Sequence, residues 1–335
     1  MPTAPLLFTA PSMSAVRLAL AAMATRFELL LLGDDPVHLR AAGEEALREI
    51  KRIEGMCNFY DASSELSRVN RHAAEAPVRL SGAMMRLLAE CRDLVAETGG
   101  RFDPSVAPAL AAWGLRHRNT PGRTPPEAEL EAIRSAIGFS RIQLDEARGT
   151  IAFPDADMKL DLGGVAKGWA LDEARIVLEE AGVENALLHG GTSTVIGMGR
   201  DEAQSEWQVG IEDPYSPAQE NRDWILEVGL AGGALSVSGI HGKTVSLEGA
   251  DHPAGHIIQP STGRAVSGQF LALVLHSKAT HADAWSTALL SDPYWSPPDN
   301  IRGTTFLKTD SGWTITAGRH WTDPSHVFTD SRRRS

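Results

Sequence analysis

Asp283 and Thr287 are the side chains of this sequence best suited by type and spacing to hold a metal ion. They lie four residues apart in the helix-like run Thr280–Leu290, so they share one face of that helix. A carboxylate and a hydroxyl are hard oxygen ligands, which suit Mg²⁺ rather than a soft metal. The alternative is a capping box over Thr280–Asp283, in which the carboxylate only secures the helix start. Taken alone, the pattern favours the cap.

A glycine turn that leads into an amphipathic helix is the second candidate site. In KLDLGGVAKGWALDEARIVLEE, an apolar run ends at Leu162, and Gly163-Gly164 turn the chain into the helix. Glycines allow a ligand to approach the backbone, and the free N–H groups of a helix start attract phosphate. Lys167 adds a positive charge in the first turn, and Asp161 lies at the end of the apolar run. The spacing differs from that of a Walker A loop, so an ordinary turn before a surface helix stays open as an alternative.

The run GHIIQPSTGR, Gly255–Arg264, is typical of a strand followed by a β-turn. Regular alternation would direct His256 and Ile258 to the same side of the strand. A functional interpretation makes His256 a base in a cleft and puts Arg264 near a phosphate. The alternative is a hairpin with a solvated histidine and arginine.

Two further segments carry candidate side chains. Asp103 follows Arg101-Phe102 and precedes Pro104, which is the pattern of a helix N-cap. Tyr60 lies in an expected loop, where an aromatic ring could stack on a planar ligand or simply pack. The sequence contains no nucleophile elbow and no HExxH metal motif.

The elements that must position these residues alternate between helical and strand-like patterns. Helices are expected at 36–56, 81–98, 104–113, 126–137, 165–181 and 282–290. Strands are expected at 25–32, 186–188, 207–211, 224–230, 235–237, 256–258, 270–276, 304–307 and 313–316, with a hairpin at 142–153 and a strand–turn–strand at 186–199. No repeat period and no long biased linker divides the chain, so one large α+β domain is predicted.

Composition limits the classes of function. The chain has 335 residues and a formal net charge of −11, which argues against nucleic acid or an anionic membrane as the main partner. Its two cysteines cannot form a disulfide framework or a cysteine-rich metal site. The apolar N-terminal stretch lacks a positive cluster and continues into a strand-like run, so we expect no signal peptide, no membrane insertion and a cytoplasmic location.

Taken in chain order, these segments resemble the ApbE-type flavin transferases, the FAD:protein FMN transferases. The matching motifs are AMATRF, YDASSELSRVN, RFDPSVAPALAAWG, LDLGGVAKGWALDEA, ALLHGGTSTVIGMG, WQVGIEDP, SVSG, HIIQPSTGR and ADAWSTALL. The resemblance covers about nine-tenths of the chain. It implies a mixed α/β domain over residues 17–325 with a T-fold-like core and a cleft for FAD. Residues 1–16 would be a flexible extension and residues 326–335 a flexible tail.

The resemblance also assigns roles to residues at matching positions. The implied FAD contacts are Met23, Tyr60, Arg101, Phe102, Asp103, Asp161, Lys167 and Ile258. The implied Mg²⁺ ligands are the backbone carbonyl of Gly164 and the side chains of Asp283 and Thr287. His256 matches a candidate base; with Asp161 and Lys167 it forms the expected catalytic set, and Arg264 is an additional phosphate cation.

The expected reaction is the Mg²⁺-dependent transfer of FMN from FAD to a threonine or serine hydroxyl of an acceptor flavoprotein, with release of AMP. Two alternatives stay open. Water as the nucleophile would make the chain an FAD pyrophosphatase that yields FMN and AMP. A chain that kept the fold without catalysis would be an FAD-binding or partner-docking protein.

Overall fold

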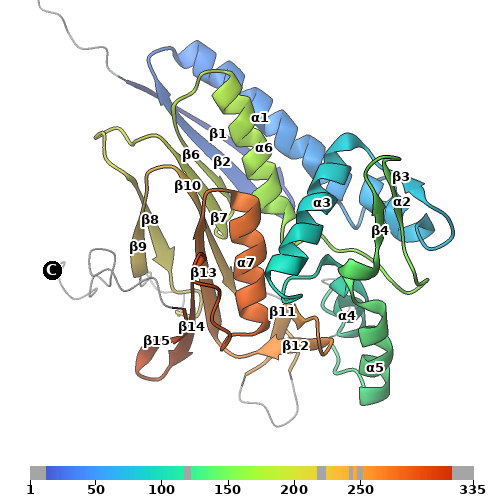
Figure 1. Cartoon of the computed structure of the whole chain (residues 1–335). Helices are drawn as coiled ribbons and strands as arrows, with labels where there is room; N and C mark the ends of the chain where they lie inside the picture. The colour runs from blue at the N-terminus through green and yellow to red at the C-terminus, as the bar shows by residue number, and fades with distance from the viewer. Residues whose placement is uncertain (1–12, 117–121, 217–223, 241–243, 247–251, 319–335) are drawn as a thin grey trace, which may run out of the picture.

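The computed structural model describes residues 13–116, 122–216, 224–240, 244–246 and 252–318. An eight-stranded antiparallel sheet forms its centre, with the strands in the order β1-β2-β6-β7-β10-β13-β14-β15 (Figure 1). These strands are β1 (Ser14–Ala22), β2 (Thr25–Gly33), β6 (Asn185–Gly190), β7 (Thr194–Met198), β10 (Gly233–Gly239), β13 (Phe270–His276), β14 (Arg302–Thr309) and β15 (Gly312–Ala317).

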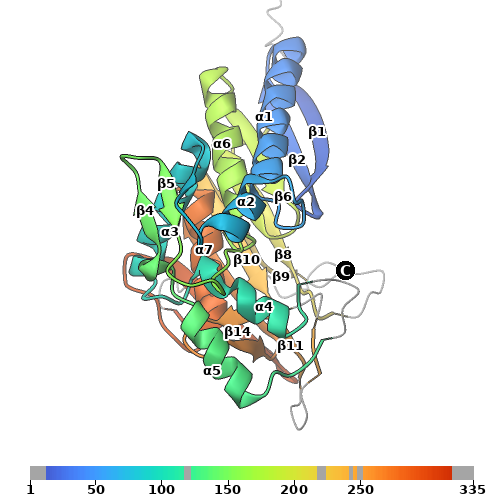
Figure 2. The same ribbon diagram turned by 90° about the vertical axis from the view of Figure 1, so that its right-hand side faces the viewer.

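Three long helices cover one face of this sheet: α1 (Pro36–Cys57), α6 (Ala166–Glu180) and α7 (Ala279–Ser291) (Figure 2). The hairpin of β8 (Trp207–Glu212) and β9 (Trp224–Leu230) packs on the opposite face. Strand β13 shows why both faces are apolar. Its residues alternate between the helix side, with Ala272 and Val274, and the hairpin side, with Leu271 and Leu273. The sheet is therefore the middle layer of the molecule.

Smaller elements gather beside α7. A three-stranded sheet contains β3 (Val78–Arg79), β5 (Thr150–Ala152) and β4 (Gln143–Asp145), and β11 (Ala254–Gln259) pairs with β12 (Arg264–Ser267). The remaining helices are α2 (Glu65–His72), α3 (Gly82–Glu97), η1 (Pro104–Val106), α4 (Ala107–Ala112), α5 (Glu127–Ala136) and η2 (Phe139–Arg141). Helices α4 and α5 pack with β11 in an apolar cluster of their own, which includes Trp113 and Ile258.

The predicted α+β class is confirmed, but two local expectations were wrong. Helix α2 occupies part of the expected loop because the Ser64 hydroxyl caps it by accepting from the Ser67 N–H at 3.0 Å. Strand β1 begins at Ser14, so the boundary expected after residue 16 falls within a strand paired with β2. Residues 1–12 and the expected tail at 326–335 lie outside the described residues. Within the described part of the chain, no helix has the length and apolar character that a membrane crossing requires.

Candidate functional site

Helix α6 and helix α7 approach each other closely at Gly168. A Cβ atom at that position would lie 2.3 Å from the Ala279 carbonyl oxygen and 2.8 Å from the Thr280 Cα atom. No side chain fits in that space, so only glycine lets the two helices reach this separation. Gly168 lies inside the helix predicted at 165–181, and a conspicuous glycine inside a helix is a signal of close packing.

Asp283 is almost fully buried where the two helices meet. It is 2% exposed, and its carboxylate accepts a hydrogen bond from the main-chain N–H of Gly168 at 3.2 Å. The capping-box interpretation of this residue was wrong. The N–H and hydroxyl of Thr280 donate instead to Asp172 of α6, at 2.8 and 2.6 Å. The Asp283 carboxylate is therefore not used to cap its own helix.

The surroundings of Asp283 favour the binding of a cation beside its carboxylate. Burial raises the pKa of this carboxyl group, while the Lys167 charge, the Gly168 amide and the Ser236 hydroxyl act in the opposite direction. A carboxylate removed from water is stabilised when a positive ion joins it. Lys167 lies in the first turn of α6 and is half-buried, so it provides part of that positive charge.

Thr287 lies one helical turn after Asp283 and faces Gly164, just before α6. A Cβ atom at Gly164 would lie 3.1 Å from Thr287 Oγ1 and 3.6 Å from the Phe102 ring. The structure therefore brings together the three residues expected to hold Mg²⁺, and the absence of a side chain at Gly164 leaves room beside the hydroxyl. Among the described residues, no group of three His, Cys, Asp or Glu side chains could hold a metal ion. A hard-oxygen site built on main-chain, hydroxyl and carboxylate groups fits the donors present.

Arg116 is a residue that sequence reasoning missed. Its buried guanidinium pairs with the Asp161 carboxylate and lies over the Phe59 ring, and burial lowers the pKa of Arg116. Asp161 also accepts from the Gly163 N–H at 2.7 Å, so the ion pair is anchored to the glycine turn. No local pattern connects Arg116 with a carboxylate 45 positions later, which is why the sequence did not indicate the pair.

Tyr60 lies at the edge of the same group. Its hydroxyl donates to the Arg116 carbonyl at 2.7 Å, while its side chain is 66% exposed. An anchored hydroxyl with an exposed ring is compatible with stacking on a planar ligand. Tyr60 and Asp161, both predicted site residues, are therefore joined through Arg116.

Asp103 has a structural role, as the N-cap alternative predicted. Its carboxylate accepts from the N–H and hydroxyl of Ser105, at 2.8 and 2.5 Å, and from the Phe139 N–H at 3.0 Å. These bonds lower the pKa of Asp103, but the larger effect of burial raises it. The carboxylate joins η1 to η2, and this internal role does not require a ligand.

The neighbouring Arg101 and Phe102 are held against α7. The Arg101 guanidinium pairs with Asp292 at 3.1 Å and lies 4.1 Å from the centre of the Trp295 ring. Phe102 is buried with its ring toward Gly164. Both residues thus adjoin the helix that carries Asp283.

Met23 occupies the two-residue turn between β1 and β2. Met23 and Ala24 have φ values of 50° and 58°, as a type I′ hairpin turn requires. The Met23 N–H donates to Glu54 of α1 at 2.6 Å. This turn explains the local conformation of Met23, and its expected contact with FAD stays a prediction.

The β11–β12 hairpin holds the last three predicted residues. Strand β11 packs against α7, with His256 exposed and Ile258 buried. A register shift between Ala254 and Ile258 interrupts the regular alternation on which the same-side expectation rested. Arg264 forms an ion pair with Glu127 at the start of α5. The hairpin and its turn agree with the prediction made from the sequence. Arg264, however, is paired with Glu127 of α5.

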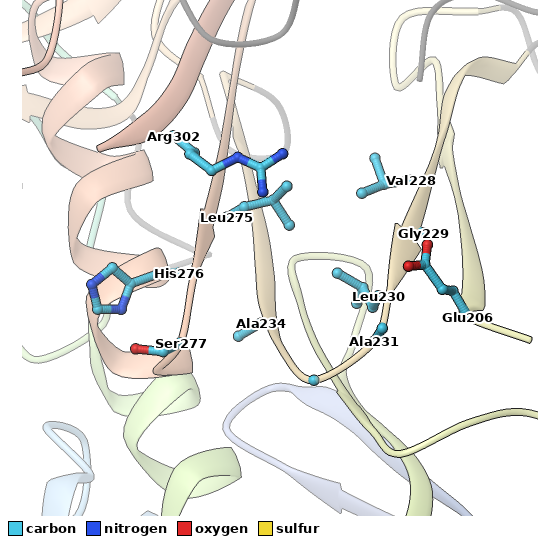
Figure 3. A pocket seen from close by; sticks show the side chains of 11 residues that line it. Glu206, Val228, Gly229, Leu230, Ala231, Ala234, Leu275, His276, Ser277 and Arg302 are labelled. Atoms are coloured by element: carbon cyan, nitrogen blue, oxygen red, sulfur yellow. The ribbon is translucent and has the colours of Figure 1, made fainter. Parts of the chain in front are cut away.

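Two open cavities lie away from these residues. The first, of about 420 Å³, lies between the β9–β10 turn and the adjoining ends of β13 and β14, with Glu206, His276 and Arg302 on its walls (Figure 3). The second, of about 710 Å³, is lined by Phe270, Tyr294 and Lys308 among others. Neither cavity is lined by a predicted site residue, so the candidate site is the contact region of α6, α7 and the Asp161 turn.

Known proteins resemble this chain in sequence and in fold. The ApbE family model matches residues 23–294. A Vibrio cholerae FAD:protein FMN transferase is 29% identical over 245 residues, which are 72% of this chain and 71% of that protein. A Salmonella typhimurium protein of the same name is 27% identical and covers 80% of this chain and 76% of its own length. The crystal structure of the ApbE protein from Thermotoga maritima has a TM-score of 0.77 at 25% identity, covering 90% of this chain and 97% of that one.

Proposed function

Because this chain belongs to the ApbE family, whose curated relatives are flavin transferases, we propose that it transfers FMN from FAD to a threonine or serine hydroxyl of an acceptor protein. The proposal includes Mg²⁺ as the resident metal and AMP as the leaving product. One observation carries it: Asp283 and Thr287 of α7 lie against the segment of Gly164 and Lys167, which is more than 100 positions away in the sequence.

The reaction exchanges the phosphoanhydride bond of FAD for a phosphoester bond to the acceptor. The acceptor oxygen forms a bond to the FMN-side phosphorus, the pyrophosphate bond to AMP breaks, and the hydroxyl proton passes to a base. Mg²⁺, held by Gly164, Asp283 and Thr287, would neutralise pyrophosphate charge. Lys167 would stabilise negative charge on the phosphoryl oxygens, since it lies in the first turn of α6, directly after the glycine turn.

The chain's other residues orient the flavin and receive the proton. The Arg116–Asp161 pair fixes the glycine turn, and the exposed Tyr60 ring would stack on the flavin. His256 is exposed on β11, which packs against α7, and we assign it as the base. His256→Gln should slow transfer about 10²–10⁴-fold while FAD and Mg²⁺ still bind. Normal transfer by that variant would remove His256 from the mechanism.

The direct test is incubation with FAD, MgCl₂ and candidate acceptor proteins, followed by intact-protein mass spectrometry and quantification of AMP. A flavin transferase adds one FMN to the acceptor and releases one AMP for each addition. FMN and AMP release with no acceptor labelled would replace the proposal with an FAD pyrophosphatase. FAD binding without either product would indicate a non-catalytic binding protein. Omission of Mg²⁺ with added EDTA is the control for metal dependence.

A further inference from the structure

We propose that Asp172 is a positioning residue, which fixes α7 against α6 so that Asp283 and Thr287 are held at Gly164. This inference rests on the proposed function for its chemistry, but its structural basis is independent of it. Asp172 lies on α6 and is 7% exposed. It has no place in the ligand set expected from the sequence.

Asp172 supplies the cap that α7 lacks in its own sequence. The residue before α7 is Lys278, whose side chain forms no capping hydrogen bond. One Asp172 oxygen accepts from the Ala279 N–H at 3.0 Å, and the other accepts from the N–H and hydroxyl of Thr280. The first N–H groups of a helix need such acceptors, and here a neighbouring helix provides them.

Asp172 is one of three successive contacts between the two antiparallel helices. Along the glycine turn and α6, the contacting residues recur every four positions, at Gly164, Gly168 and Asp172. They meet, in this order, Thr287, then Asp283, then the Ala279–Thr280 start of α7. The first two contacts contain all three expected metal ligands. The third contains the carboxylate that accepts from the main-chain N–H groups at the start of α7.

A second residue of α6 supports the same end of α7. Arg175 donates to the Ser277 carbonyl at 3.0 Å and lies 3.8 Å from the Asp172 carboxylate. The start of α7 is therefore held on both its N–H groups and the carbonyl that precedes it. A shift of α7 along α6 would break these bonds and would also move Asp283 and Thr287 away from Gly164.

The test compares Asp172→Ala and Asp172→Asn with Asp35→Ala in the full-length chain. Asp35 caps α1 by accepting from the N–H groups of Val37 and His38. The substitution Asp35→Ala therefore removes a similar cap from a helix that carries no expected metal ligand. The Mg²⁺ dissociation constant, measured by calorimetry with FAD present, should rise about 10–100-fold in Asp172→Ala, as for other supporting residues of metal ligands. Asp172→Asn retains one acceptor oxygen and should lie between this variant and the parent. Asp35→Ala should bind Mg²⁺ like the parent.

Amide hydrogen exchange provides a readout that needs no metal. In Asp172→Ala, exchange should accelerate in residues 279–287, whereas in Asp35→Ala it should accelerate at the start of α1. Parent-like exchange at 279–287 overturns the proposal, and so does parent-like Mg²⁺ affinity in folded Asp172→Ala. Equal losses of Mg²⁺ affinity in Asp172→Ala and Asp35→Ala also overturn it, because a general loss of stability would then explain both. If the parent binds no Mg²⁺ but exchange at 279–287 accelerates in Asp172→Ala, the proposed function fails. The role of Asp172 in fixing α7 against α6 is then still supported.

Discussion

The guanidinium of Arg116 pairs with the carboxylate of Asp161, and this partly buried ion pair joins the Tyr60 loop to the glycine turn that precedes α6. The two partners differ in their access to water. The Arg116 side chain is 4% exposed and that of Asp161 is 20% exposed. Each is positioned by further contacts, Arg116 by the Phe59 ring and Asp161 by the Gly163 N–H.

Asp161→Ala should strongly reduce the free energy of unfolding, because it leaves the buried Arg116 charge without a counter-ion. Breaking a buried pair in this way costs about 3–5 kcal/mol. Urea denaturation at constant pH measures the change. Asp155→Ala is the matched control, since its pair with Arg141 is largely exposed and should contribute less than about 1 kcal/mol. Equal effects of the two substitutions would contradict the assignment of a buried pair.

Asp283→Ala removes the only charged side chain of the expected metal site. Mg²⁺ affinity and AMP release should both collapse, while the fold persists because the Asp172 cap at the start of α7 is untouched. Thr287→Val should be milder, since water can replace a neutral oxygen ligand. Isothermal titration with MgCl₂ and an AMP assay measure both variants. Parent-like turnover of FAD by folded Asp283→Ala would exclude this residue from the site.

Tyr60→Ala should weaken FAD binding by about 1–3 kcal/mol, on the scale of base–aromatic stacking. Tyr60→Phe separates the ring from the hydroxyl, because it keeps the exposed ring but loses the hydrogen bond to the Arg116 carbonyl. If stacking dominates, the phenylalanine variant should bind FAD nearly as well as the parent. Quenching of flavin fluorescence gives the dissociation constants, and an unchanged value for Tyr60→Ala would place the ring outside the flavin site.

Gly168→Ala should be destabilising although alanine favours helices. The added methyl group would collide with the backbone at Ala279, so α7 must move and Mg²⁺ affinity should fall as well. Gly55→Ala in α1 is the control, because nothing lies within 4 Å of its Cβ position. There the same substitution should stabilise the helix by up to about 1 kcal/mol. Thermal unfolding of both variants checks the difference in sign.

Both cysteines should resist thiol reagents in the native protein. Burial raises the pKa of the Cys57 thiol to about 12 and raises that of Cys91 well above its ordinary value, so almost no thiolate is present at pH 8. A colorimetric thiol assay should therefore detect no rapidly reacting group before denaturation and two groups in denaturant. A fast native reaction would show that the helix packing around α1 and α3 opens readily.

Local patterns were sufficient to predict much of the fold. The helices at α1, α6 and α7 follow apolar periodicity, and the β11–β12 hairpin follows its proline and glycine turn. The short helix α2 was missed because its N-cap lies in a polar segment that also fits a loop. Such ambiguity arises where few apolar residues mark the period.

The candidate site could be predicted from the sequence only where two expected ligands lie on one element. Asp283 and Thr287 share a helix face, so their spacing indicated oxygen ligands. Arg116 and Asp172 act on residues 45 and more than 100 positions away, and no local pattern encodes such a contact. Whether Thr280 and Asp283 form a capping box likewise depended on which helix supplies the acceptor for the Thr280 N–H group. Tertiary packing supplies that acceptor from Asp172 of α6.

The separation of 115 positions between Gly168 and Asp283 has a consequence for biosynthesis. At about 5–20 residues per second, the ribosome completes α6 on the order of ten seconds before it completes α7. During that interval the nascent chain carries the glycine turn and Lys167, but not the carboxylate of Asp283. The side of α6 that packs on α7 then lacks its partner, although α1, which also packs on α6, is already present. That side of α6 is a surface that chaperones or proteases can engage. Translation arrested before residue 279 would produce a chain with one half of the site and no means to complete it.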